Sequence, residues 1–372
     1  MTIQYIRFLK PPPTECLIGQ HFTIVWTIES DLGDQTYWET VPVIISLQGS
    51  PQLGLRELTA DPKIKSKKKA VFKPYAQTKP GLSTDVPVVF DPMRGGGIVT
   101  QLVIEQLPGK PVEIGQQVSI QLCLSLAPVV RSEPTSHPVW HEAYQFQSSL
   151  WIVPAWSCPI LTTAAKQRHR EVSESSDQAE RWIKLPKQRQ LQIKEDAVQS
   201  IARHVWDCGL GMCQFLFEQA MDTVFDEVVE LGSGTGLVGI YAAELLKTHH
   251  VYLTDLPDAL EIMQQNIVSQ DKLSVRELAW GGKRDEDYSR VNLVLLTDVL
   301  YNQSSHDVLL ETLDWLLDNK DCKALLAFKE RNPDEREFFV KVESRGWQCE
   351  RVLNQEHLVC EIYWIQKNPS YA

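Results

Sequence analysis

Three glycines at alternate positions, Gly232, Gly234 and Gly236, follow a short apolar run and precede a helical pattern that begins near Leu237. This order of strand, glycine turn and helix is the context that a nucleotide-type cofactor loop requires. Glycine has no Cβ, so the backbone can turn sharply and approach a ligand closely. The positive end of the following helix would face that ligand. Because such loops also occur with nothing bound, the neighbouring residues have to decide the role of this one.

Two acidic residues flank the glycine loop. Glu230 lies at the end of the preceding strand, where a carboxylate suits a cationic or hydroxyl-bearing cofactor better than a pyrophosphate. Asp255 ends the next apolar run, about 20 residues further on, where a ribose-binding acid is expected. An NAD-type Rossmann domain, or a fold that has lost its ligand, is the alternative interpretation of these residues alone.

The segment Glu230-Leu-Gly-Ser-Gly-Thr-Gly236, followed by Thr254-Asp255, resembles motif I and the second-strand acid of the seven-β-strand (class I) methyltransferases. These enzymes use S-adenosylmethionine, so the resemblance implies that cofactor here. It assigns cofactor binding to five residues of this region: Glu230, Gly232, Ser233, Gly234 and Asp255.

Two tryptophans extend the resemblance to the family-16 methyltransferases, which are mostly protein-lysine methyltransferases. Trp206 lies in a segment, 204–216, that resembles the Val-Trp-(Asp/Glu)…Leu helix before motif I, and in that family the tryptophan lies beside the cofactor. Trp280, in Leu278-Ala-Trp-Gly281, matches a second pattern of the family and offers a flat face and an indole N–H suited to flanking an adenine. A buried core tryptophan is the alternative in both places.

The end of the fourth predicted strand, Leu296-Thr-Asp-Val-Leu-Tyr301, belongs at the sheet edge where open α/β folds bind ligands. Methyltransferases of base amines or glutamine amides carry Asn-Pro-Pro-Tyr there. Asp298-x-x-Tyr301 instead resembles the signature of the lysine-methylating branch, and the resemblance makes Asp298 and Tyr301 the candidate catalytic residues. Thr297 would lie beside the adenine. The alternative is a helix N-cap at Asp298 with Tyr301 in the core.

The chemistry of a lysine substrate fits this pair of residues. A lysine amine attacks a sulfonium methyl only when neutral, yet its ordinary pKa is ~10.4. Asp298 could orient the amine by hydrogen bonding, and Tyr301 could line the channel with an aromatic face that suits a cation. A carboxylate alone would raise the lysine pKa, so desolvation has to offset it. The sequence leaves open whether Asp298 takes the proton or only positions the substrate.

Apolar strands alternate with helical patterns after the glycine loop, which predicts a Rossmann-like parallel sheet covered on both faces. A last pair of strands, 347–353 and 358–366, predicts a terminal antiparallel hairpin, which brings the sheet to the seven strands of the methyltransferase fold. The strands before it are expected at 251–255, 273–278, 291–296 and 324–328. Helices are expected at 200–217, 237–246, 257–269, 304–317 and 333–344.

The N-terminal part, 1–160, alternates polar and apolar residues and predicts an all-β, sandwich-like domain. Its strands are expected at 22–28, 41–47, 98–104, 118–124 and 144–152. No residue of this part carries a chemical motif, so it is either a platform that recognises a partner or a structural appendage. Polar residues 161–180 predict a linker with little fixed structure, and 181–194 a hairpin leading into a methyltransferase domain at 181–372. The basic run 63–69 could contact nucleic acid, serve as a localisation signal, or be a solvated loop.

The composition indicates a globular protein. The chain has 372 residues, of which 43% are hydrophobic and 23% charged. Residues 1–160 are neutral, so the remainder carries the whole net charge of -11, which repels nucleic acid and attracts basic targets. No apolar run would span a membrane, and the N-terminus lacks a signal-peptide pattern. Eight scattered cysteines without a Cys-x-x-Cys pair predict no metal or disulfide framework and a reducing cytosolic or nuclear setting.

Together these observations predict an S-adenosylmethionine-dependent methyltransferase that acts on a lysine ε-amine of a protein. A small-molecule amine methyltransferase using the same site is a second hypothesis. The third is a non-catalytic binding module in which the β domain acts and the methyltransferase fold is inactive. The target lysine, the degree of methylation and the oligomeric state stay open.

Overall fold

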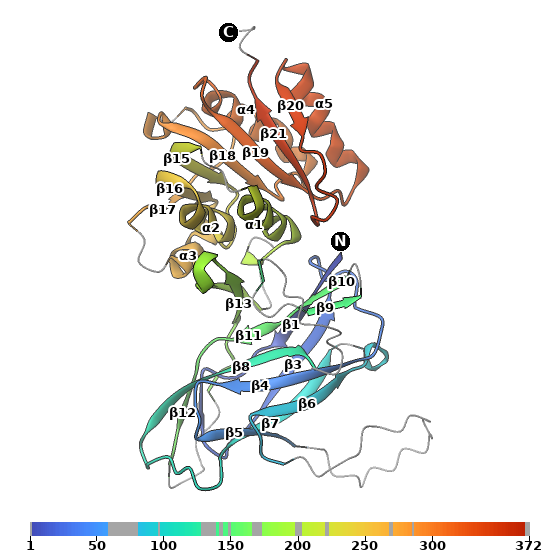
Figure 1. Cartoon of the computed structure of the whole chain (residues 1–372), viewed down its shortest axis with the longest axis vertical. Helices are drawn as coiled ribbons and strands as arrows, with labels where there is room; N and C mark the ends of the chain where they lie inside the picture. The colour runs from blue at the N-terminus through green and yellow to red at the C-terminus, as the bar shows by residue number, and fades with distance from the viewer. Residues whose placement is uncertain are drawn as a thin grey trace.

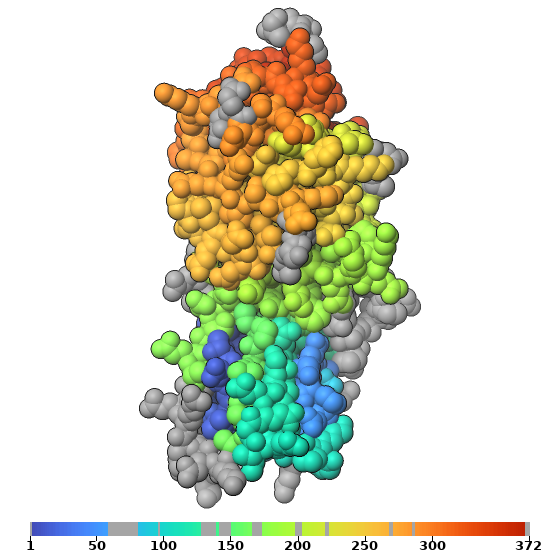
Figure 2. Space-filling view, turned by 90° about the vertical axis from the view of Figure 1, so that its left-hand side faces the viewer, coloured from blue at the N-terminus to red at the C-terminus, as the bar shows by residue number. Residues whose placement is uncertain are grey.

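The chain forms a β-rich lobe and an α/β lobe, one above the other along the long axis of the molecule (Figure 1). This computed structural model describes residues 2–58, 81–95, 97–127, 139–140, 144–147, 150–165, 173–197, 203–219, 223–267, 271–284 and 286–368. The basic run 63–69 lies outside the described residues. In Figure 2 the blue and teal N-terminal residues gather in one lobe, the yellow to red residues form the other, and green residues lie between them.

The α/β lobe is built on a seven-stranded sheet in the order β17-β16-β15-β18-β19-β21-β20. The strands are β15 (Val224–Leu231), β16 (Lys247–Asp255), β17 (Leu273–Glu277), β18 (Val291–Thr297), β19 (Lys323–Phe328), β20 (Gln348–Arg351) and β21 (Glu361–Gln366). β21 runs antiparallel to β19 and β20, whereas β15 to β19 pair in parallel. The predicted Rossmann-like methyltransferase fold is confirmed.

Successive residues of the central strands enter different cores, because side chains of a strand alternate between its two faces. Val228 and Leu295 belong to one core, and their neighbours Val229 and Leu296 to the other. Each core is covered by helices. They are α1 (Asp207–Gln219), α2 (Leu237–Leu245), α3 (Pro257–Asn266), α4 (His306–Leu316) and α5 (Glu337–Ser344). This two-sided burial explains why the strands appear in the sequence as continuous apolar runs.

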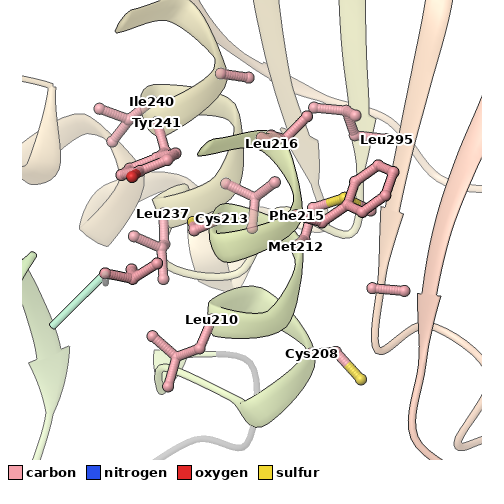
Figure 3. Close-up of a cluster of buried hydrophobic side chains, with 14 of the residues drawn as sticks. Cys208, Leu210, Met212, Cys213, Phe215, Leu216, Leu237, Ile240, Tyr241 and Leu295 are labelled. Carbon is pink, nitrogen blue, oxygen red and sulfur yellow. The ribbon is translucent and has the colours of Figure 1, made fainter. Parts of the chain in front are cut away.

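Helices α1 and α2 pack against each other, and both also contact the sheet, α1 at β18 and β19 and α2 mainly at β15 and β16. Figure 3 shows Met212 and Phe215 on the side of Leu295 in the sheet, and Cys213 on the side of α2 residue Leu237. The helix begins at Asp207, so the prediction of one helix over 200–217 that contains Trp206 is wrong. The residues before it are held by a side chain instead, since the Val205 N–H donates to the buried Glu195 carboxylate at 3.1 Å.

The β-rich lobe contains two sheets. One has the order β5-β7-β3-β1-β10-β9, and the other β14-β13-β11-β8-β12-β2, with β4 paired to β8 and β6 to β4. The first sheet's strands are β1 (Thr2–Lys10), β3 (His21–Glu29), β5 (Leu53–Glu57), β7 (Ile98–Gln106), β9 (Tyr144–Gln147) and β10 (Leu150–Val153). The second sheet's strands are β2 (Glu15–Leu17), β4 (Val41–Gln48), β6 (Asp85–Phe90), β8 (Gln117–Leu126), β11 (Ala155–Ser157), β12 (Ile160–Thr163), β13 (Gln178–Lys184) and β14 (Gln190–Asp196). Their inward side chains, such as Trp26, Ile45 and Leu122, form a third core.

Two predictions for this part of the chain are wrong. The strand predicted at 144–152 is two antiparallel strands, β9 and β10. The linker predicted at 161–180 has a strand at each end, because β12 pairs with β8 and β2, and β13 pairs with β11 and β14. These strands could not be recognised from the polar sequence, because they form through backbone hydrogen bonds to other strands of the chain. Residues 166–172 of this segment lie outside the described part.

The predicted hairpin at 181–194 is β13 and β14, and it joins both lobes. It extends the β-rich lobe's second sheet through β11, while Asn266 of α3 exchanges hydrogen bonds with the backbone of Lys194 at 2.8 and 3.0 Å. Tyr5 of β1 and Ile183 of β13 share one hydrophobic core with α1 and α2. The lobes are therefore continuous in their packing. Within the described residues, no helix is long and apolar enough to cross a membrane.

Candidate active site

A cavity of about 490 Å³ lies at the carboxyl ends of β15, β16 and β18. Every candidate residue from the sequence lines it, including the two candidate catalytic residues. These are Trp206, Glu230, Gly232, Ser233, Gly234, Asp255, Trp280, Thr297, Asp298 and Tyr301. They meet there because the carboxyl ends of parallel strands share one sheet edge. Among the described residues, no cluster of His, Cys, Asp or Glu could hold a metal ion.

The glycine loop closes one side of the cavity. Gly232, Gly234 and Gly236 have φ values of 69°, 55° and 79°, in the left-handed region that side chains with a Cβ rarely adopt. A Cβ on Gly232 would lie 3.1 Å from Val299 Cγ1 and 3.2 Å from Trp280 Cζ2. Both the backbone conformation and the lack of space therefore restrict position 232 to glycine. With no side chain there, the backbone of the loop forms part of the cavity wall.

Ser233 and Asp255 hold the loop in shape. The Ser233 hydroxyl donates to the Glu230 carbonyl at 3.2 Å and accepts from the Thr254 N–H at 2.9 Å. The Asp255 carboxylate accepts from the Gly234 N–H at 2.8 Å and from the Leu256 N–H at 2.7 Å. A carboxylate can accept further hydrogen bonds, so Asp255 keeps acceptor capacity for hydroxyls in the cavity.

Glu230 places a buried carboxyl group on the wall of the cavity. Its side chain is 1% exposed and accepts hydrogen bonds from the Gly239 N–H at 2.9 Å and the Thr297 hydroxyl at 3.3 Å. Burial raises the pKa of Glu230 to about 8, although these hydrogen bonds oppose the rise. A cation bound beside it would favour the ionised form. The arrangement therefore suits a ligand with a positively charged group.

Aromatic side chains line other walls of the cavity. Trp280 follows β17 and packs against the glycine loop beside Gly232. Trp206, placed just before α1, has the guanidinium of Arg331 5.8 Å from its ring centre. Both tryptophans are partly exposed at the cavity, so neither is the fully buried core residue of the alternative interpretation.

Asp298 lies at the end of β18 with φ 60°, an unusual conformation for a residue with a side chain. Both of its carboxylate oxygens accept hydrogen bonds from Arg331, one of them at 2.6 Å. Burial raises the pKa of Asp298, and the paired guanidinium limits the rise. The nearby helical turn is capped by Asn302 instead, and Tyr301 is 61% exposed, so the N-cap and core alternative does not hold.

Several residues at or beside the cavity were not predicted from the sequence, and three of them bear on the chemistry of Asp298. Arg331 lies shortly after β19 and lines the cavity. Leu32, from the β-rich lobe, lines the cavity, and its neighbour Asp31 binds Arg331 at 2.8 Å. The N-terminal part, in which the sequence shows no chemical motif, therefore contributes to the region of the site. A carboxylate at Asp298 could have suggested a basic partner at the same sheet edge, but no local pattern marks Asp31.

This chain is similar to known lysine methyltransferases. A family model described as lysine methyltransferase matches residues 185–345. The chain is 30% identical over 202 residues to a UPF0665 family protein of Schizosaccharomyces pombe. This match covers 50% of this chain and 60% of that protein. It is 30% identical over 171 residues to EEF1A lysine methyltransferase 3 of Xenopus tropicalis, covering 45% and 75%. It is 34% identical over 186 residues to protein N-lysine methyltransferase METTL21A of Mus musculus, covering 48% and 83%. This chain belongs to the lysine methyltransferase family, and S-adenosylmethionine is its cofactor.

Proposed function

We propose that this protein transfers the methyl group of S-adenosylmethionine to the ε-amine of a lysine in a protein substrate. The observation that carries the proposal is the position of Asp298 and Tyr301 on the same cavity as the glycine loop. Relatives of this chain are named for methylation of protein lysine, one of them for EEF1A.

The residues of the cavity fit the cofactor. Gly232 leaves a cradle that a Cβ would fill, and the carboxylate of Glu230 suits the cationic amino-acid end of the cofactor. Asp255 keeps acceptor capacity for ribose hydroxyls, and Trp280 offers a flat face for the adenine. When bound, S-adenosylmethionine supplies an electrophilic methyl group on a sulfonium.

The lysine has to enter neutral and aligned with the methyl group. Tyr301, exposed at the cavity, offers a phenol ring against which a side-chain cation can lie. The largely apolar cavity lowers the pKa of an entering amine because burial disfavours the charged form. Asp298 already accepts two hydrogen bonds from Arg331. We therefore assign Asp298 to orienting the amine through its remaining acceptor capacity, with the proton lost to solvent as the lysine enters.

The test compares wild-type protein with Asp298→Ala. Each is incubated with tritiated S-adenosylmethionine and an extract of cells that lack this chain, and the label is then assigned to amino acids. We expect methyl-lysine in protein from the wild type and little from the variant. Equal labelling of lysine by both would contradict the proposal. Label confined to the low-mass fraction would support a small-molecule amine acceptor instead.

We also propose that the β-rich lobe is a sandwich-like domain that helps to select the protein substrate. Leu32 of this lobe lines the cavity, which supports a role in recognition. A basic substrate would suit the acidic C-terminal part of the chain. A cytosolic or nuclear location is part of the proposal, and it is supported by the free thiols of all eight cysteines.

A further inference from the structure

We propose that Asp31, which the β-rich lobe contributes, is a positioning residue of the methyl-transfer site. This inference rests on the proposed function, because it concerns how that function's candidate residue Asp298 is held. It gives the β-rich lobe a part in positioning the site, in addition to any part in recognition. Asp31 acts through Arg331 and does not itself line the cavity.

Asp31 lies in the loop after β3 and is buried at the junction of the lobes. Its side chain is 2% exposed. Its backbone carbonyl accepts a hydrogen bond from Arg7 at 3.0 Å, and its carboxylate accepts from the Leu32 N–H at 3.0 Å. The loop is thus fixed to its own lobe, while the adjacent Leu32 reaches the cavity and is 49% exposed.

The carboxylate of Asp31 bridges two cations of the α/β lobe. It lies 3.2 Å from Lys329 Nζ and 2.8 Å from Arg331 Nη2. Each cation also holds a carboxylate of its own lobe, because Lys329 binds Asp207 at 2.6 Å and Arg331 binds Asp298 at 2.6 Å. Burial alone would raise the pKa of Asp31, but Lys329 and Arg331 lower it below the ordinary value. Asp31 therefore remains ionised and central to the cluster.

The charge of this cluster leaves a place for a substrate cation. Asp207, Asp31 and Asp298 contribute carboxylates, and Lys329 and Arg331 contribute cations, so the fully ionised cluster has one excess negative charge. This excess would attract a lysine ammonium towards Asp298, before the amine loses its proton in the apolar cavity. Removing the charge of Asp31 would cancel the excess and reduce the attraction for that ammonium.

Asp31 also sets the direction of the Arg331 guanidinium. Its Nη2 donates to both Asp31 and Asp298, and its Nη1 donates to Asp298. A planar guanidinium held by two carboxylates on different lobes has one orientation. Without Asp31 the guanidinium would keep only its bonds to Asp298, and the pair could shift together towards Trp206 and the cavity. Asp298 would then lose its fixed geometry, and misplacement of about 1 Å can lower a rate about 100-fold.

The experiment uses the full chain and three variants. Asp31→Asn keeps the size of the side chain and removes the charge, and Asp31→Glu keeps the charge. Asp34→Asn is the matched control, because Asp34 lies in the same loop, is exposed, and bonds only Ser30 among the described contacts. The rate of tritiated methyl transfer to extract protein lysine is measured against extract dilution, and the dissociation constant of S-adenosylmethionine is measured by calorimetry.

We expect Asp31→Asn to lower the maximal rate at least about tenfold, with the cofactor dissociation constant within about twofold of the wild type. Asp31→Glu should recover part of the rate, and Asp34→Asn should match the wild type. A wild-type rate for Asp31→Asn would overturn the inference. The inference would also be overturned if Asp31→Glu failed to recover the rate and thermal melts showed that the loss of rate follows a loss of folded protein.

The same experiment distinguishes a failure of the proposed function from a failure of this inference. If the wild type labels only small molecules, lysine transfer is excluded, and the ratio of Asp31→Asn to wild-type rates on those acceptors still decides the positioning role. If cofactor binds but no acceptor is labelled, both proposals are overturned.

Discussion

Arg331 grips Asp298 with both terminal nitrogens of its guanidinium, although the two residues follow different strands and are 33 positions apart in the chain. The pair ties the end of β18 to the end of β19 at the mouth of the cavity. The carboxylate nearest the proposed substrate channel is thus fixed before any ligand arrives. Preorganised groups of this kind cost no reorganisation during the reaction.

Asp298→Asn should lower the rate of lysine methylation about 100-fold or more, since an amide holds neither the guanidinium nor an entering amine as a carboxylate does. The cofactor dissociation constant should stay within a few-fold, because the predicted cofactor contacts lie elsewhere on the cavity. Single-turnover transfer and calorimetry measure the two effects. Asp307→Asn is the control, as Asp307 is an exposed residue bonded to Lys341. A parallel loss of cofactor affinity and rate would instead mean that the cavity had collapsed.

Gly232→Ala should weaken cofactor binding about tenfold or more. The φ of 69° strains an alanine, and its Cβ would press on Val299 and Trp280. Gly109→Ala is a matched control, because Gly109 has φ 73° with open space around its Cβ. Calorimetric titration with S-adenosylmethionine should separate the two. Equal affinity of both variants would show that the loop does not approach the cofactor.

Cofactor affinity should rise with pH up to about 8. Burial raises the pKa of Glu230 to about 8 in the free protein, so below that pH the carboxyl is mostly protonated. A bound cation favours the ionised form, so binding releases a proton and strengthens by up to about tenfold for each pH unit towards 8. Calorimetry from pH 6 to 9 in buffers of different ionisation enthalpy measures both effects.

Glu230→Gln provides the control for that titration. The cofactor's own α-amino group titrates near ~8, which affects any variant equally. The glutamine variant should bind more weakly and should lose the rise in affinity below pH 8. Retention of the full slope in this variant would assign the proton to another group.

Glu195 and Arg181 form a buried ion pair whose loss should destabilise the whole chain. Their side chains are 2% and 0% exposed, and they lie 2.7 Å apart. Burial alone would raise the pKa of Glu195, but Arg181 and other neighbours lower it to about 2. Because the folded pKa is depressed, the stability it provides is present above the ordinary pKa of ~4.3 and is lost as pH falls through about 2.

Glu195→Gln should therefore lose this acid dependence and unfold with about 3–5 kcal/mol less free energy at pH 7. Urea unfolding between pH 2 and 7 measures it. The control is Glu105→Gln, which breaks a pair with Arg56 that is about one-third exposed, and it should cost at most about 1 kcal/mol. Similar losses in both variants would contradict the assigned difference in burial.

Leu32→Ala should raise the KM for the protein acceptor about threefold to tenfold, with little change in cofactor affinity. Leu32 lines the cavity from the β-rich lobe with half of its surface exposed. Val99→Ala is the control, as Val99 is an exposed apolar residue of β7 in the same lobe that does not line the cavity. Rates against substrate dilution measure KM. An unchanged value for Leu32→Ala would remove this lobe from the recognition of substrate.

The α/β lobe was largely predictable because its strands are buried on both faces, as Val228 and Val229 illustrate. Such strands appear as apolar runs, and parallel pairing brings their carboxyl ends to one edge. Residues as distant as Glu230 and Asp298 could thus be assigned to one cavity from their place at strand ends. Local pattern and global topology agree in this region.

The parts that were missed depend on contacts between distant segments. Trp206 precedes α1 because Glu195 binds the backbone beside it, which no helical periodicity reveals. Arg181 is a charged residue that is fully buried in β13, so the polar sequence around it predicts solvent exposure. Asp31 meets Arg331 across 300 positions. Tertiary pairing of this kind overrides local propensity and leaves no signal in the segment itself.

The core shared by Tyr5, Ile183 and helix α1 means that the segment 185–345, recognisable by its family pattern, is not an excisable module. A fragment cut at residue 185 would leave apolar surface of α1 uncovered and would lose the partner of β14. The α/β lobe could therefore not be expressed by itself, or fused to another protein, unless other residues buried that apolar surface. Relatives without a comparable β-rich lobe must close this side of α1 in another way.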